Sequence, residues 1–164
     1  MRTRRQMALL FLMAFAFFAS ATETRTIVIP GNAAWTDTGI EVVQGQEISF
    51  EAAGKISLQK GNPQADCGPE GYDLRTVQQP LSDRNLGALI GKVVIAVTVI
   101  KDPDTGKERT EEAAELFHIG AGCRVAMPAK GRLFLGINEL VVGDNAGEFT
   151  VAVATAGEEV SPHL

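Results

Sequence analysis

From Thr24 onward, the apolar residues either alternate with polar ones or run in short blocks that Gly, Pro, Asn and Asp interrupt. This spacing is typical of β-strands rather than helices. We expect strands at 25–29, 39–43, 46–53, 88–100, 113–119, 132–138 and 147–154. Three of them place apolar side chains on one face, and these faces predict the core. They carry Ile48, Phe50 and Ala52; Leu133, Leu135 and Ile137; and Phe149, Val151 and Val153.

The segments between these strands contain residues that favour tight reversals of the chain. Gln44-Gly45 is typical of a short turn, and 102–106 (DPDTG) of a longer hairpin loop. About seven strands joined in this way predict an all-β fold, an antiparallel β-sandwich. The stretch 108–116 is rich in Glu and Ala and could also form a short helix. Because Phe117-His-Ile-Gly120 resembles a strand, we interpret this stretch as a hairpin arm with solvated glutamates.

Residues 60–86 show no sustained periodicity and contain several Gly and Pro residues among polar ones. They predict a long ordered loop. A loop of this length is uncommon in a compact domain and often carries function.

The N-terminal residues 1–21 have the pattern of a secretory signal peptide. A positively charged start precedes about a dozen apolar residues, and Ala19-Ser-Ala21 is the kind of small-residue site that a signal peptidase accepts. The apolar run is shorter than the roughly 20 residues of a membrane span. We therefore expect a secreted or periplasmic protein with no membrane insertion after cleavage. It would have one domain at 22–156 and a disordered tail at 157–164.

The net charge of the chain indicates which classes of partner it could bind. The 164 residues include 15 basic and 20 acidic residues. Cleavage would remove Arg2, Arg4 and Arg5, leaving 12 basic and 20 acidic residues and a net charge of −8. Such a chain would be repelled by phosphate backbones, so nucleic acid and anionic membranes are poor candidates, whereas cations are better ones.

Export would also affect the oxidation state expected for the two cysteines. In an oxidising compartment, Cys67 and Cys123 could pair and close a loop of more than 50 residues. Alternatively, they are two separate buried thiols, because sequence spacing does not show whether their Cβ atoms meet.

The segment 136–147 (GINELVVGDNAG) concentrates oxygen-bearing side chains between two predicted strands. Asn138, Glu139, Asp144 and Asn145 lie within eight residues, and carboxylate, amide and carbonyl oxygens are the ligands that calcium accepts. The alternative is an ordinary hairpin turn, which uses the same residue types. The segment is not an EF-hand, and nothing in the chain has zinc-ligand spacing.

Several blocks of the chain, in order, resemble the PA-I-type galactophilic lectin family. They cover about 34–153, and the clearest are WTDTGI at 35–40, GQEISFEAAG at 45–54, GPEG at 68–71, GALI at 87–90, FHIG at 117–120, GRLFLGINE at 131–139 and DNAGEF at 144–149. The resemblance implies a calcium-containing β-sandwich of jelly-roll, galactose-binding-domain-like type. Because tetramers occur in the family, the resemblance also implies that the protein could form a homo-oligomer.

What the family implies can be carried over residue by residue. Calcium would be held by Glu139, Asp144 and Asn145, by the carbonyl of Leu58, and by a loop carbonyl for which Val142 is the nearest match. Two hydroxyls of a bound sugar would complete the coordination shell.

This chain departs from the family's pattern in three ways. Glu139 stands where Asp is usual, and the loop that follows is about two residues shorter than in the galactose-specific members. The sugar-contacting His has no match, since Arg75 or Thr76 falls at its position, while Gln78 aligns with the sugar-contacting Gln. The implied sugar contacts are thus Glu139, Asp144, Gln78 and Arg75, and galactosides are only one class of carbohydrate to test.

Three functions compete. We expect a calcium-dependent carbohydrate-binding module. The loss of the family's His favours the alternative of a structural or adaptor β-sandwich of the cell envelope that binds no sugar. A glycosidase using Glu139 and Asp144 is disfavoured, because carboxylates that ligate calcium stay ionised and cannot donate a proton. We therefore do not expect an enzyme.

Overall fold

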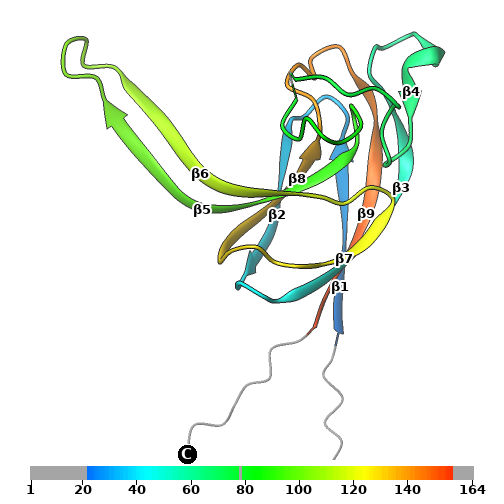
Figure 1. Cartoon of the computed structure of the whole chain (residues 1–164), viewed down its shortest axis with the longest axis horizontal. Helices are drawn as coiled ribbons and strands as arrows, with labels where there is room; N and C mark the ends of the chain where they lie inside the picture. Colours follow the sequence, from blue (N-terminus) through cyan, green and yellow to red (C-terminus); the bar gives the residue numbers. More distant parts are fainter. Residues whose placement is uncertain (1–21, 78, 157–164) are drawn as a thin grey trace, which may run out of the picture.

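The computed structural model describes residues 22–77 and 79–156. The expected signal peptide (1–21), the expected tail (157–164) and Gln78 lie outside the described residues. In the described part, two antiparallel sheets enclose a single core, which confirms the all-β sandwich (Figure 1). No helix in this part has the length and apolar character needed to cross a membrane.

Each sheet is antiparallel throughout. The first has the strand order β1 (Thr22–Pro30), β9 (Ala146–Ala156) and β3 (Glu47–Ser57), and both β4 (Asp66–Cys67) and β7 (Gly122–Ala126) pair with the far edge of β3. The second has the order β2 (Trp35–Val42), β8 (Gly131–Ile137), β5 (Leu89–Lys101) and β6 (Glu108–His118).

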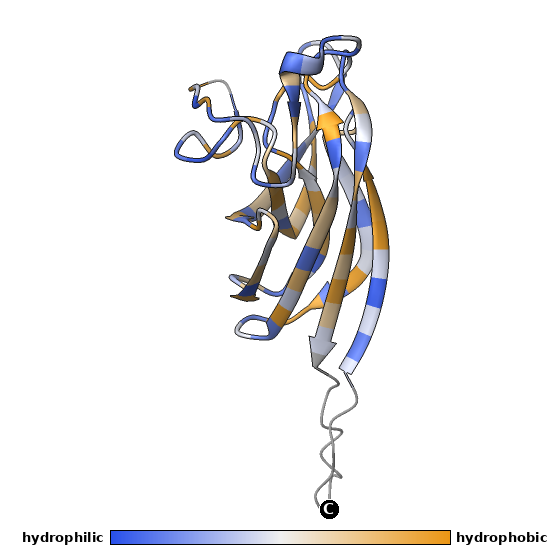
Figure 2. Ribbon diagram, turned by 90° about the vertical axis from the view of Figure 1, so that its right-hand side faces the viewer, coloured by the Kyte–Doolittle hydropathy of each residue, from blue (hydrophilic) through white to orange (hydrophobic). Residues whose placement is uncertain are grey.

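The core lies where the sequence pattern predicted it. Side chains from the inward faces of β3, β8 and β9 meet between the sheets, and Phe50 and Phe149 are among its largest buried members. Strands β1, β2 and β5 add Ile29, Ile40 and Val93. The alternation that buries these residues is visible as bands of hydrophobic and hydrophilic colour along the strands in Figure 2. Apolar burial on this scale is the main term that favours folding.

The Glu-rich stretch forms a strand and no helix. β6 begins at Glu108 and pairs with β5 along its whole length, from Ile90↔His118 to Lys101↔Glu108. The tertiary pairing with an apolar strand overrides the helix propensity of its Glu and Ala residues. The two strands and the 102–106 turn make the hairpin arm that the sequence predicted, and Figure 1 shows this arm reaching away from the sandwich.

Some elements were not expected. β7 and β4 are too short to show a period, and β1 begins three residues before the predicted 25–29 strand. The 60–86 loop is ordered by a 3-10 turn, η1 (Pro63–Ala65), and by a bridge between Tyr72 and Leu86. Two backbone hydrogen bonds tie the ends of this loop to the β8–β9 connection: one from Lys60 N to Asp144 O, 2.8 Å, and one from Gly87 N, directly after the loop, to Asn138 O, 3.1 Å. These bonds bring the two functional candidates of the sequence to the same end of the sandwich.

Candidate functional site

The β8–β9 connection begins at Asn138, whose side chain is fully buried. Its Oδ1 accepts from Leu81 N at 2.8 Å, while its Nδ2 donates to Leu81 O at 2.9 Å and to Asn85 O at 3.0 Å. One amide thereby fastens the end of the long loop to the end of β8. Sequence analysis placed Asn138 in the polar cluster but missed this role. An Asn directly after a buried apolar strand was the available signal.

Asn145 closes the same connection from its other end. This side chain is buried, and its Nδ2 donates to Gly31 O at 3.1 Å and to Glu139 Oε2 at 2.6 Å. Its Oδ1 is buried and has no hydrogen-bond partner among the described residues. An unsatisfied buried oxygen costs about 1 to 3 kcal/mol, and a bound ion or water is one way in which native proteins remove that cost. The orientation of the amide thus leaves an oxygen available to a cation.

Glu139 is half-buried beside this oxygen. Burial raises the pKa of its carboxyl, the hydrogen bond from Asn145 opposes that shift, and the charge of Asp144 adds to it. Two carboxylates close enough to disturb each other, next to an unpaired amide oxygen, would be stabilised by a divalent cation.

The other predicted calcium ligands lie at the same end of the molecule. Asp144 is exposed, and its carbonyl accepts from Lys60 N. Lys60 is two residues beyond Leu58, which directly follows β3. The carbonyl of Val142 accepts from Asn145 N at 3.1 Å. That bond uses one of the two lone pairs of the Val142 carbonyl, so this oxygen is less free for a metal than the sequence implied.

The chemistry of these donors fits calcium. They are carboxylate, amide and carbonyl oxygens, which calcium binds in a flexible geometry. No group of three or more His, Cys, Asp or Glu side chains in the described part of the chain could hold a metal ion. A cation at this place would therefore depend on the Asn145 amide and backbone carbonyls as well as on the two carboxylates.

The predicted sugar contacts are less well placed. Arg75 is exposed in the long loop, and no hydrogen bond or ion pair among the described residues joins it to Glu139 or Asp144. Gln78 lies outside the described residues. Its neighbour Gln79 is buried, and its amide donates to Leu81 O at 2.8 Å and to Arg84 O. Gln79 thus shapes the loop.

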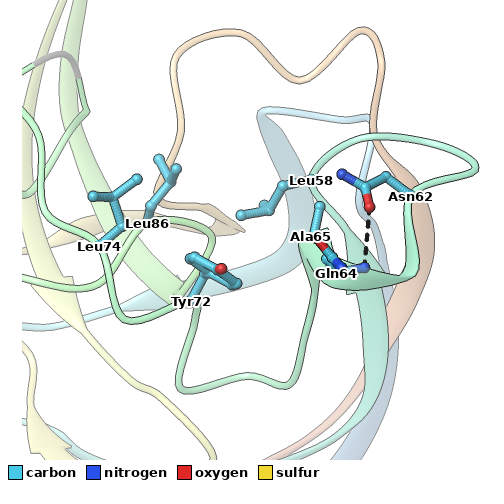
Figure 3. A pocket seen from close by; sticks show the side chains of 7 residues that line it. All are labelled: Leu58, Asn62, Gln64, Ala65, Tyr72, Leu74 and Leu86. Carbon is cyan, nitrogen blue, oxygen red and sulfur yellow. Dashed lines mark hydrogen bonds between the residues drawn. The ribbon is translucent and has the colours of Figure 1, made fainter.

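A pocket opens at Leu58, whose carbonyl is one of the candidate calcium ligands. It has a volume of about 290 Å³ and is lined by Leu58, Asn62, Gln64, Ala65, Tyr72, Leu74 and Leu86 (Figure 3). Leu58 is shared between the pocket and the candidate calcium site. Tyr72 and Leu74 are 42% and 47% exposed. Aromatic rings partly open to solvent suit contact with the apolar face of a ring-shaped ligand. The sequence showed these residues only as part of an aperiodic loop.

The cysteines do not form the disulfide that the sequence left open, and both are free thiols. Cys67 pairs with Ile56 and Cys123 with Phe50, so the two partners are six residues apart on β3. Six residues of strand span about 20 Å, well beyond the reach of a disulfide. Burial raises the pKa of the Cys67 thiol to about 11, with further contributions from the charges of Glu139 and Asp66. Cys67 is therefore an inert thiol beside the candidate site.

The fold is similar to that of a solved lectin domain. That structure is described as the EclA N-terminal domain, a PllA-like lectin, with 22% sequence identity and a TM-score of 0.55. The match covers 79% of this chain and 94% of the lectin domain. No family model matches the chain, and no curated protein matches it.

We predict that Asn138→Ala loosens the long loop while the sandwich stays folded. The variant loses three hydrogen bonds. Leu81 O and Asn85 O keep other donors, whereas the half-buried Leu81 N is left without its partner, so the loss should cost about 1 to 3 kcal/mol. Hydrogen exchange followed by mass spectrometry should show faster exchange at 79–87 and unchanged protection in β3 and β9. Asn62→Ala, which removes two exposed side-chain hydrogen bonds at η1, is the control. Equal exchange at 79–87 in both variants would contradict the assigned role of Asn138.

A second prediction concerns Glu139 in the calcium-free protein. Its raised pKa means that the folded state binds the proton more tightly than the unfolded state does. Ionisation of Glu139 therefore destabilises the fold: its contribution is most favourable below the unfolded pKa and decreases as pH rises towards the folded one. In chelator at pH 7, Glu139→Gln should melt at a higher temperature than the parent. Below about pH 4, where the carboxyl is protonated, the difference should disappear. A variant that melts lower at pH 7 would contradict this assignment.

Proposed function

We propose that the protein is a secreted, calcium-dependent carbohydrate-binding module. The side chains of Glu139, Asp144 and Asn145 and the carbonyl of Leu58 would hold the ion, and two hydroxyls of a sugar would complete its shell. The observation that carries this proposal is the buried Oδ1 of Asn145, which lacks a partner beside Glu139. The fold shared with a PllA-like lectin domain also supports it.

Calcium would offset the electrostatic cost of the site. It would neutralise the charges of Glu139 and Asp144 and supply the missing partner of Asn145. Because calcium tolerates varied coordination numbers, sugar hydroxyls can replace bound waters at small cost. The ion would also keep both carboxylates ionised, which leaves neither as a proton donor and argues against glycosidase activity.

The long loop would provide the remaining contacts. Tyr72, Leu74 and Leu86 form an apolar wall next to Leu58, and this wall could contact the carbon-rich face of the sugar ring. Arg75 follows Leu74 of this wall and is exposed, so it would be a further polar contact for the ligand. The acidic character of the chain disfavours nucleic acid as a ligand. A secreted or periplasmic location and a cleaved signal peptide are also part of this proposal. The sugar class is left to the binding test, in which galactosides are one candidate.

The experiment measures calcium and sugar binding separately. Calcium added to the chelator-treated protein should raise its melting temperature, because a ligand at 100 times its dissociation constant stabilises by about 2.7 kcal/mol. Asp144→Ala should abolish this increase and leave the calcium-free fold intact. The matched control is Asp104→Ala, which removes an exposed carboxylate from the turn of the hairpin arm. Calorimetry with a panel of monosaccharides should then show binding in calcium and none in chelator.

The outcomes distinguish the candidates. Calcium binding without any sugar binding would support the structural or adaptor alternative. No heat with calcium, or an Asp144→Ala variant that binds calcium as the parent does, would refute the proposed site.

A further prediction tests the pocket. Tyr72→Ala should weaken sugar binding by about 3- to 10-fold, because an aromatic contact contributes about 0.5 to 1.5 kcal/mol. Its calcium affinity should stay unchanged, since Tyr72 offers no oxygen to the proposed shell. Val77→Ala, in the same loop but outside the pocket, is the control. Parental sugar affinity in Tyr72→Ala would exclude this wall from the binding site.

A further inference from the structure

The hairpin arm has an open edge that the rest of the sheet does not cover. β8 pairs with β5 only from Leu89 to Val94, whereas β6 pairs with β5 as far as Lys101. A bulge lies between Val94 and Ala96, where the contact with β8 ends, and bulges bend the strand that contains them. Beyond it, residues 95–101 have a strand neighbour on one side only within the described ranges 22–77 and 79–156.

The residues of this open edge are of the types that favour pairing with a further β-strand. Its sequence is IAVTVIK, with no charge before Lys101. Ile95, Val97 and Val99 are 51%, 59% and 61% exposed. A two-stranded ribbon is marginally stable by itself in water, and a neutral, β-branched edge is a template for a further strand.

The opposite edge of the arm differs in charge. β6 carries Glu108, Glu111, Glu112 and Glu115, and Arg109 is the one Lys or Arg of the strand. Two copies paired antiparallel through β6 would bring glutamates close to glutamates, which is destabilising. The charges therefore protect the β6 edge and leave the β5 edge available.

We propose that the open β5 edge pairs with the same edge of a second copy of this chain. Residues 95–101 of the two copies would run antiparallel and centre on Thr98, so that each Val97 faces a Val99 and each Lys101 faces an Ile95. No like charges face each other in this register. The contact is isologous: the same edge of each copy takes part. Both open edges are therefore paired in the dimer, and no further copy can add to them.

The base of the arm is held in place for such pairing. Lys92 is only 8% exposed, and its ammonium bonds Glu112 at 2.5 Å. The same ammonium lies 4.6 Å from the centre of the Trp35 ring and 5.2 Å from that of Phe134. Because Glu112 pairs with Val97 in the ladder, this ion pair fixes the arm to the sandwich where the open edge begins. A pre-positioned edge loses less entropy on association.

Sedimentation of the purified protein in chelator tests the proposal independently of calcium and sugar. The parent should associate to a dimer between about 1 and 100 µM. A variant with both Val97→Lys and Val99→Lys places lysines opposite each other and should dimerise at least about 10-fold more weakly. A variant with Val28→Lys and Val43→Lys, two similarly exposed valines off the arm, should dimerise as the parent does. Circular dichroism checks that each variant is folded.

Cross-linking tests the register. In a Cys123→Ser background, Thr98→Cys should form a disulfide-linked dimer under mild oxidation, because the two residues meet at the two-fold axis. Glu111→Cys lies opposite Thr98 in the ladder, on the other edge of the arm, and should not cross-link. A parent that sediments as a monomer up to about 100 µM would overturn the proposal. Equal cross-linking of the two cysteine variants, or association that the paired lysines leave unchanged, would also overturn it. A monomer with slowly exchanging amides at 95–101 would show that the same chain covers the edge.

Discussion

The arrangement of the candidate site depends on the Asn145 side chain. Its Nδ2 joins two segments far apart in the sequence, the turn at Gly31 and the start of the β8–β9 connection at Glu139. Because both donor bonds are made, the amide cannot rotate to satisfy its Oδ1 without breaking them. The unpaired oxygen is therefore a consequence of how the connection is closed. A cation would supply what the described residues do not.

The fold can tolerate this local cost because its stability comes from elsewhere. The core is built from the inward faces of strands in both sheets, and none of the proposed calcium ligands belongs to its fully buried members. Asn138 then links the core to the site, since it follows the buried Ile137 and holds the long loop by three hydrogen bonds. Burial of apolar surface supports the scaffold, while a few polar contacts position the site on it.

The sequence predicted features that depend on short-range periodicity. Alternation identified the core faces of β3, β8 and β9, and the cluster of oxygen-bearing residues identified Glu139, Asp144 and Asn145, two of which the structure joins by a hydrogen bond. Features set by long-range register were not predictable. The separation of Cys67 from Cys123 follows from where β4 and β7 pair along β3. The pocket around Tyr72 forms because an aperiodic loop folds back onto Leu58. Local sequence patterns do not indicate this long-range contact.

The hairpin arm shows the same limit at a larger scale. Alternation and the DPDTG turn predicted its two strands. Its projection from the sandwich depends on the β5–β8 pairing, which stops at Val94 and Arg132, beside the bulge in β5. Its two edges then differ in charge: the β6 edge carries glutamates that disfavour pairing with another strand, whereas the β5 edge consists mainly of valine and isoleucine. If two arms pair, each assembly carries two copies of the candidate site, and a weak single-site affinity for a sugar is multiplied on a surface that presents many sugars. The exposed apolar edge would thus contribute to sugar binding indirectly: it would join two calcium sites in one dimer, and each site alone would bind the sugar weakly.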